Sequence, residues 1–166
     1  MNGKTLLIVV IVIVALGSAF FFFKGDTRLI DWNASPQTIR SDIDDIFEHL
    51  ETIKESAALA PAARLQAVSG EIEDIAVITE RIARTISRAD AALPEVQNFQ
   101  SLVRDLHDEA LKINVLFRAI DPNGTSMSRE ELAARLKAAY EKLVAMSEDV
   151  DAAFAALIAA LEKEPA

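Results

Sequence analysis

The sequence predicts an all-α protein in which one N-terminal transmembrane helix is followed by an antiparallel, up-down four-helix bundle. The first observation is an uncharged apolar run, residues 5–23, between Lys4 and Lys24. The second is a repeat of apolar residues at alternating spacings of three and four, the heptad pattern of packed helices. Proline- or glycine-marked breaks divide this repeat into four segments, which favours a folded bundle over a rod-like coiled coil.

The apolar run is long enough to cross a bilayer. Its 19 residues would form a helix of about 29 Å, close to the thickness of the hydrocarbon core. A cleaved signal peptide is the alternative, with Gly17-Ser18-Ala19 as the cleavage site. Residues 20–23, all phenylalanine, extend the run to full bilayer length and favour retention. Residues 1–28 are therefore expected to be a membrane anchor, with the lipid bilayer as a partner.

The short basic tail before the span has the layout of a signal anchor, which favours an extracytoplasmic, periplasmic position for the bundle. The flanking positive charges do not decide the orientation, because Lys4 with the amino terminus is matched by Lys24 and Arg28. The net charge of −9 argues against a nucleic-acid partner, since phosphate binding needs a basic surface. The lack of cysteine excludes disulfides, thiolate metal sites and a cysteine nucleophile.

A juxtamembrane linker, residues 29–35, is expected next, and its Trp32 suits either the headgroup level or the base of the bundle. The first bundle helix is predicted at 36–57. Ser35 and Pro36 are the residue types preferred at the N-cap and at the first position of a helix. Its seam consists of Ile39, Ile43, Ile46, Leu50 and Ile53, beside a solvated acidic stripe of Asp44, Glu48, Glu51 and Glu55.

The second and third helices are predicted at 61–89 and 94–120, each opened by a proline. In the second helix, Val77 and Ile78 widen the apolar stripe, which predicts burial on more than one side. The two seams consist of Leu65, Val68, Ile72, Ile75, Thr79, Ile82 and Ile86, and of Val96, Phe99, Val103, Leu106, Ala110, Ile113, Phe117 and Ile120.

The last helix is predicted at 128–163. It follows the strongest turn signal in the chain, 121–124 with its Asn-Gly pair, and opens with a capping box formed by Ser128 and Glu131. Residues 36–163 are thus expected to be one bundle domain. The seam of the last helix consists of Leu132, Leu136, Ala139, Leu143, Met146, Val150, Phe154, Leu157 and Leu161.

An arginine stripe, Arg81, Arg84 and Arg88, lies near the end of the second helix, where an up-down bundle returns to the level of the linker. With Trp32 it is a candidate membrane-proximal interaction site for anionic headgroups or an acidic partner. Internal pairing, such as that of Arg84 with Glu80 one turn earlier, is the alternative.

The two histidines, His49 and His107, are the candidate cofactor ligands. They are expected at similar height on the first and third helices, an arrangement that would suit a haem or metal ion held across the bundle. Both stand one step aside from the seam, however, and neither has the Glu-x-x-His spacing of di-iron bundles. Partly exposed surface histidines, with no cofactor and no metal, are therefore the preferred interpretation.

The sequence lacks the motifs of nucleophilic, metalloprotease and phosphate-binding sites, so no catalytic residues are predicted. The preferred function is a non-enzymatic, single-pass accessory or scaffold subunit whose bundle docks on a membrane-associated protein complex. The alternative is a membrane-tethered bundle that binds haem or another ligand. Self-association into a homo-oligomer is compatible with both.

Overall fold

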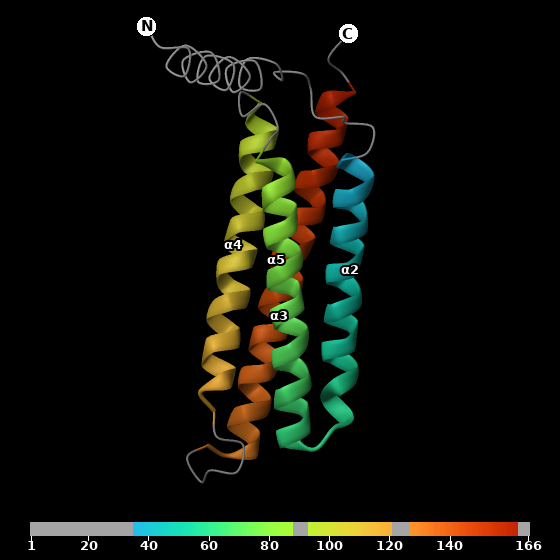
Figure 1. Cartoon of the computed structure of the whole chain (residues 1–166). Helices are drawn as coiled ribbons and strands as arrows, with labels where there is room; N and C mark the ends of the chain where they lie inside the picture. Colours follow the sequence, from blue (N-terminus) through green and yellow to red (C-terminus); the bar gives the residue numbers. More distant parts are fainter. Residues whose placement is uncertain (1–34, 88–92, 121–126, 163–166) are drawn as a thin grey trace, which may run out of the picture. The chain divides into compact units, whose positions relative to one another are not determined.

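The computed structural model describes residues 35–87, 93–120 and 127–162, all within one compact unit, Asn33–Ala166 (Figure 1). In these residues the secondary structure is helical, with four long helices and no strand. This confirms the predicted all-helical fold for the described part of the chain. The elements are α2 (Ser35–Glu55), the 3₁₀ helix η1 (Ser56–Ala58), α3 (Pro61–Ile86), α4 (Pro94–Arg118) and α5 (Arg129–Leu161).

The predicted transmembrane helix, 5–23, lies outside the described residues, and so do Trp32 and Arg88. Among the helices that the structure describes, none combines the length and the apolar character that a bilayer span requires. The membrane anchor therefore stays a prediction from the sequence.

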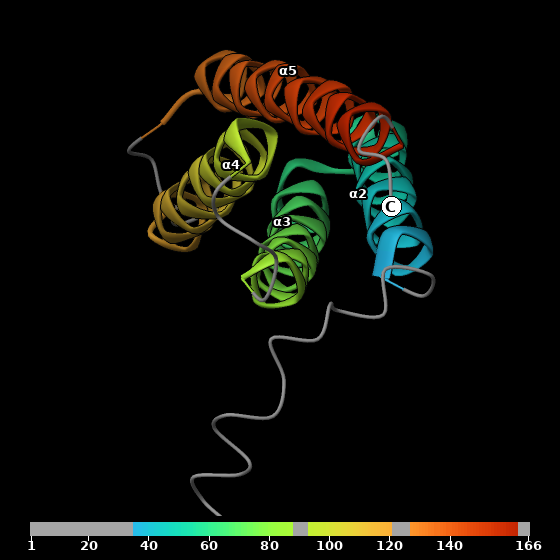
Figure 2. The same cartoon turned by 90° about the horizontal axis from the view of Figure 1, so that it is seen from above.

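The four long helices alternate in direction and form a ring in which each packs on two others (Figure 1). α3 lies between α2 and α4, and α5 closes the ring by packing on both α4 and α2 (Figure 2). On this closing side, Arg40 of α2 forms ion pairs with Asp151 of α5 and with Asp44 one turn further along α2. The first and last helices of the bundle are therefore direct neighbours.

The heptad seams form the core. All predicted seam residues of α2 and α3 are buried, including the hydroxyl-bearing Thr79. On the opposite side, the rings of Phe99 on α4 and Phe154 on α5 pack with their centroids 5.5 Å apart. The seam is weaker on α5, where Ala139 and Met146 are only partly buried. Since burial of one large apolar side chain contributes roughly 1.5–3 kcal/mol, these seams provide the main stabilisation of the bundle.

Local signals set where the helices begin. Pro61 and Pro94 occupy the first turns of α3 and α4, where a missing N–H is tolerated. The Ser128 hydroxyl accepts a hydrogen bond from the backbone N–H of Glu131 at 3.1 Å, as the capping box predicts. The Glu131 carboxylate accepts a hydrogen bond from Arg135, one turn further along α5.

The helices end earlier than predicted. α2 stops at Glu55 rather than 57, because the chain tightens into η1, where the buried Ser56 hydroxyl donates to the carbonyl of Ile53. α3 ends at Ile86 rather than 89, and α4 at Arg118 rather than 120. α5 covers 129–161 rather than 128–163. An apolar pattern alone does not show where the last helical turn gives way to a turn.

The prediction that Val77 widens the buried stripe is wrong. Its side chain is 55% exposed, whereas Ile78 beside it is buried. Successive helical residues are about 100° apart, so Val77 falls opposite the seam while Ile78 falls at its edge. α3 is therefore covered on its inner face and its two flanks, but not on its outer face.

Candidate functional site

The two candidate histidines approach α3 from different helices. His49 belongs to α2 and His107 to α4, and α3 lies between these two helices (Figure 2). Both rings are partly exposed, as predicted, but each has specific partners on α3. The two flanks of α3 are therefore the places where the chemistry of the bundle is concentrated.

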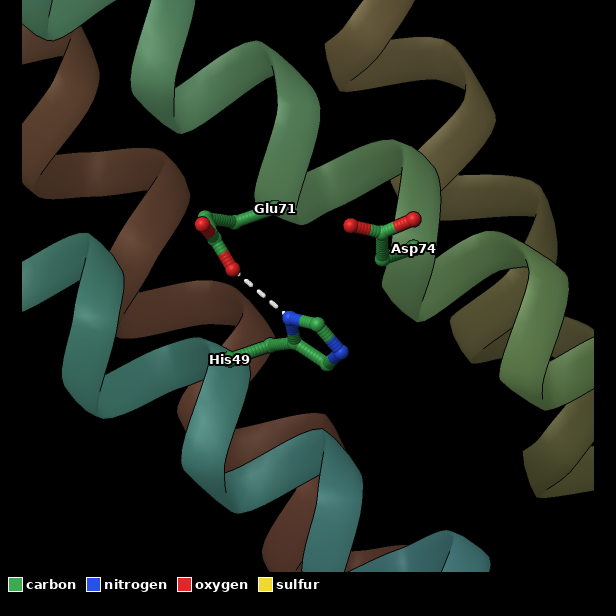
Figure 3. Close-up of side chains that lie close together, drawn as sticks. All are labelled: His49, Glu71 and Asp74. Carbon is green, nitrogen blue, oxygen red and sulfur yellow. Dashed lines mark hydrogen bonds and ion pairs between the residues drawn. The ribbon is translucent and has the colours of Figure 1, made fainter.

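On the α2 flank, the imidazole of His49 lies between two carboxylates (Figure 3). Its Nδ1 atom is 2.6 Å from Oε2 of Glu71, with which it forms a hydrogen bond. Asp74, one turn further along α3, stands beside the same ring. One donor atom from each of the three side chains lies within 4.8 Å of the other two. No other group of three histidine or acidic side chains in the described ranges has this metal-ligand spacing.

Helix geometry and core packing hold these three side chains in place. Glu71 and Asp74 are three residues apart, a spacing that puts both on the same side of α3. Ile72 and Ile75, their neighbours in the chain, are at most 1% exposed and fix this turn of α3 against the core. Leu50, 2% exposed, does the same for the turn of α2 that carries His49. The backbone positions of the three polar side chains are thus set by buried apolar neighbours.

On the α4 flank, the hydrogen-bond partners of His107 among the described residues are neutral groups. Its Nδ1 atom is 2.9 Å from the backbone carbonyl oxygen of Ala76 and 3.1 Å from Oγ1 of Thr79. A carbonyl oxygen can only accept, so Nδ1 carries the proton and donates it. The Thr79 hydroxyl in turn lies 2.9 Å from the carbonyl oxygens of Ile75 and Ala76, to which it can donate. His107 is therefore hydrogen-bonded to the backbone of α3.

The structure does not bring the two histidines together. His49 contacts α3 at positions 71 and 74, whereas His107 contacts it at positions 76 and 79. These two contact regions are about 8 Å apart along the helix axis and lie on different flanks of α3. A haem or metal ion held jointly by both histidines does not fit this arrangement.

Comparison of the chain with protein-family models, curated proteins and solved structures gives no significant match.

Arg81 of the arginine stripe binds a buried carboxylate on α2. Its Nε donates to Oδ1 of Asp42 at 2.9 Å, its Nη2 donates to the same oxygen, and Asp45 lies 3.6 Å away. The Asp42 side chain is 5% exposed, and its Oδ2 has no hydrogen-bond partner in the described part of the chain. The hydrogen bond that Arg81 donates to Asp42 raises the pKa of Arg81, against an opposing effect of desolvation. Arg81 is thus the counterion of Asp42.

Arg84 is paired within its own helix. It donates to the carboxylate of Glu80, one turn earlier, which is the internal pairing weighed from the sequence. Its side chain is 76% exposed, and an ion pair at such a position contributes about 1 kcal/mol at most. Arg88 and Trp32 lie outside the described residues, so the membrane-proximal site stays a prediction.

The C-terminal half of α4 carries an exposed apolar surface. Leu111, Val115 and Leu116 are 44%, 67% and 55% exposed, and we refer to these three side chains as the α4 patch. They are three of the five large apolar side chains that are exposed in the described residues. Leu116 also lines a groove of about 320 Å³ between α4 and α5, whose floor includes Ile113 and Phe117. Leu116 therefore places one side chain of the α4 patch at the groove.

Sequence reasoning missed the partners of His49 and Arg81. Asp42 precedes a seam residue and has the appearance of a surface carboxylate, while Glu71 and Asp74 have the appearance of ordinary charges on a solvated face. The signal that identifies them is the register between α2 and α3. Antiparallel pairing that places Asp42 beside Arg81 also places His49 beside Asp74, because both helices advance at the same rise per residue.

Proposed function

We propose that the protein is a non-enzymatic, single-pass membrane accessory or scaffold subunit whose four-helix bundle docks on a membrane-associated protein complex. The observation that carries the docking part of this proposal is the α4 patch. The membrane part is supported by the apolar run, 5–23.

The α4 patch has the character of a protein-binding surface. Single exposed apolar residues are common on soluble proteins, but several of them beside an apolar groove often mark an interaction site. A groove between two antiparallel helices suits an amphipathic helix, which lays its apolar face into the groove. We therefore take the occupant to be a helix of the partner protein.

Charge favours a different protein over a second copy of this chain. Each copy carries a net charge of −9, so two copies repel one another. Beside the groove, Lys142 forms an ion pair with Glu109, and Arg135 forms one with Glu131. The charges at the rim of the groove are therefore paired within the bundle. A partner helix with an apolar face and basic flanks complements this combination of a neutral rim and an acidic body.

The test compares two exposed valines. Val115→Asp alters the α4 patch, and Val77→Asp alters a similarly exposed valine on the outer face of α3. We expect the first variant to lose the protein that crosslinks to and co-purifies with the full chain from its native membranes, and the second to retain it. Both should melt like the wild type, since neither side chain is buried. Retention of the same crosslinked partner by Val115→Asp and Leu116→Asp would contradict the proposal.

The membrane part has its own test. A reporter that is active only outside the cytoplasm, fused after Ala166, should be active if the bundle is extracytoplasmic. Activity of a cytoplasm-specific reporter at the same position would reverse the orientation. Release of the chain from membranes by high salt or carbonate would contradict the single-pass anchor.

A further inference from the structure

We propose that His49, Glu71 and Asp74 form a binding site for a divalent transition-metal ion, with Zn²⁺ as the representative, that joins α2 to α3. This site is separate from the α4 patch, so the two proposals stand or fall independently. Its basis is the closeness of one nitrogen and two oxygen donors on two adjacent helices.

The donor atoms are close to the spacing that a metal ion needs. Zinc bonds nitrogen and carboxylate oxygen at 2.0–2.2 Å, which puts the donors of a tetrahedral site about 3.3 Å apart. The donor atoms of this group lie within 4.8 Å of one another, so side-chain movements of about 1.5 Å at most bring them to that spacing. The His49 Nδ1 atom already faces Glu71 at 2.6 Å, and an ion would replace the proton between them.

The charge of the site fits a divalent cation. Two carboxylates and a neutral imidazole together carry −2. Asp74 has no hydrogen bond or ion pair to the described residues, and Glu71 is hydrogen-bonded there to His49 rather than paired with a fixed positive charge. The ion pairs between other described helix positions join a carboxylate to an arginine or a lysine, whereas Glu71 meets a histidine. The α2 flank thus contains a local excess of negative charge next to an imidazole, the combination that a bound cation balances.

The donor types select the class of metal. An imidazole nitrogen with carboxylate oxygens suits zinc and neighbouring first-row ions such as Mn²⁺ and Fe²⁺, whereas Mg²⁺ and Ca²⁺ prefer oxygen donors alone. The site has no sulfur donor, because the chain has no cysteine. Asp74 is exposed, so water can reach the fourth position of a tetrahedral ion.

Direct binding measurements test the proposal. The full-length chain, without a histidine tag and stripped of metal by a chelator, is titrated in mild detergent with Zn²⁺ against a competing indicator. We expect one Zn²⁺ per chain, and a rise in Kd of about tenfold or more in His49→Gln, Glu71→Gln and Asp74→Asn. Circular dichroism checks that each variant is folded.

Two control variants test whether Zn²⁺ binding depends on these three side chains in particular. His107→Gln removes the other imidazole that contacts α3, and Glu73→Gln removes a carboxylate of the same turn that is ion-paired with Arg118. Both should bind Zn²⁺ like the wild type. Asp74 is exposed and makes no hydrogen bond or ion pair with the described residues, so Asp74→Asn remains folded and decides the case even if another variant does not fold. The proposal is overturned if the wild type binds less than one Zn²⁺, if Asp74→Asn binds it unchanged, or if Mg²⁺ competes equally well.

Discussion

The two flanks of α3 use the same kinds of residue in different ways. On the α2 flank, His49 stands between two carboxylates and Arg81 covers the buried Asp42, so the contacts there are charged. On the α4 flank, His107 forms hydrogen bonds with a backbone carbonyl and with the hydroxyl of Thr79. The Ser69 hydroxyl donates to the side-chain oxygen of Asn114 on the same flank, at 2.6 Å.

This difference shows that the role of a histidine in a helical bundle depends on its cross-helix partner. His107 donates its Nδ1 proton to a neutral acceptor, an arrangement that fixes the ring without adding charge. His49 shares a hydrogen bond with one carboxylate and stands beside another, an arrangement in which a cation can replace a proton. The hydrogen bonds of His107 on the α4 flank thus hold two helices together, whereas the carboxylates beside His49 on the α2 flank are suited to binding a cation.

The largest expected effect is at Arg81. Arg81→Met leaves the buried Asp42 carboxylate without a counterion, and we expect it to lower the free energy of unfolding by about 2–3 kcal/mol, discounted because Arg81 is half exposed. The double variant Asp42→Leu/Arg81→Met should regain most of this loss. Urea denaturation measures both, with Arg84→Met as the control, expected within about 0.5 kcal/mol of wild type. If Arg84→Met and Arg81→Met unfold alike, the Asp42–Arg81 pair has no special role.

A smaller effect is expected from the hydroxyl on the other flank. Thr79→Val keeps the shape of the buried side chain but removes one neutral hydrogen-bonding group, and should lower the free energy of unfolding by about 1 kcal/mol. The control is Thr85→Val, which removes a similar hydroxyl-to-carbonyl bond at a more exposed position of α3 and should change stability little. Thermal melting distinguishes the two. Equal melting temperatures would mean that the polar contacts of the α4 flank do not stabilise the bundle.

The smallest expected effect has the opposite sign. In metal-free protein, Asp74→Asn should raise the free energy of unfolding by about 0.3 kcal/mol, because it removes repulsion from Glu71 one turn away. Urea denaturation at low and at high salt measures the change, which should shrink as salt screens the two charges. A loss of more than about 1 kcal/mol would show that Asp74 has a structural role and that the α2 flank resembles the α4 flank after all.

The fold was predictable because it depends on local patterns. Heptad seams, two helix-opening prolines and the Ser128 cap each act within a few residues, so they place α2 to α5 in order and identify most of the core. Helix ends were less predictable, because the last turn of a helix often tightens into a 3₁₀ turn, as it does at Ser56, without a change in the apolar pattern.

The candidate sites were predictable only in part. The sequence pointed to His49, His107 and the arginines as polar residues beside the seams, and the Glu80–Arg84 pair followed from their spacing of four. It did not indicate that Asp42 is buried, or that Glu71 and Asp74 face His49. Those contacts join residues 22 or more positions apart, and they depend on the vertical offset between two helices, which no local pattern specifies.

The closure of the ring between α2 and α5 determines how the bundle would respond to mechanical force. The start of α2 and the end of α5 lie at the same end of the bundle, and Arg40 and Asp151 join these helices a short distance below it. Tension applied between the start of α2 and the end of α5 would therefore peel α5 away from α2 one turn at a time instead of shearing all their contacts at once. Under such tension, we expect the contact between Arg40 and Asp151 to be among the first to part.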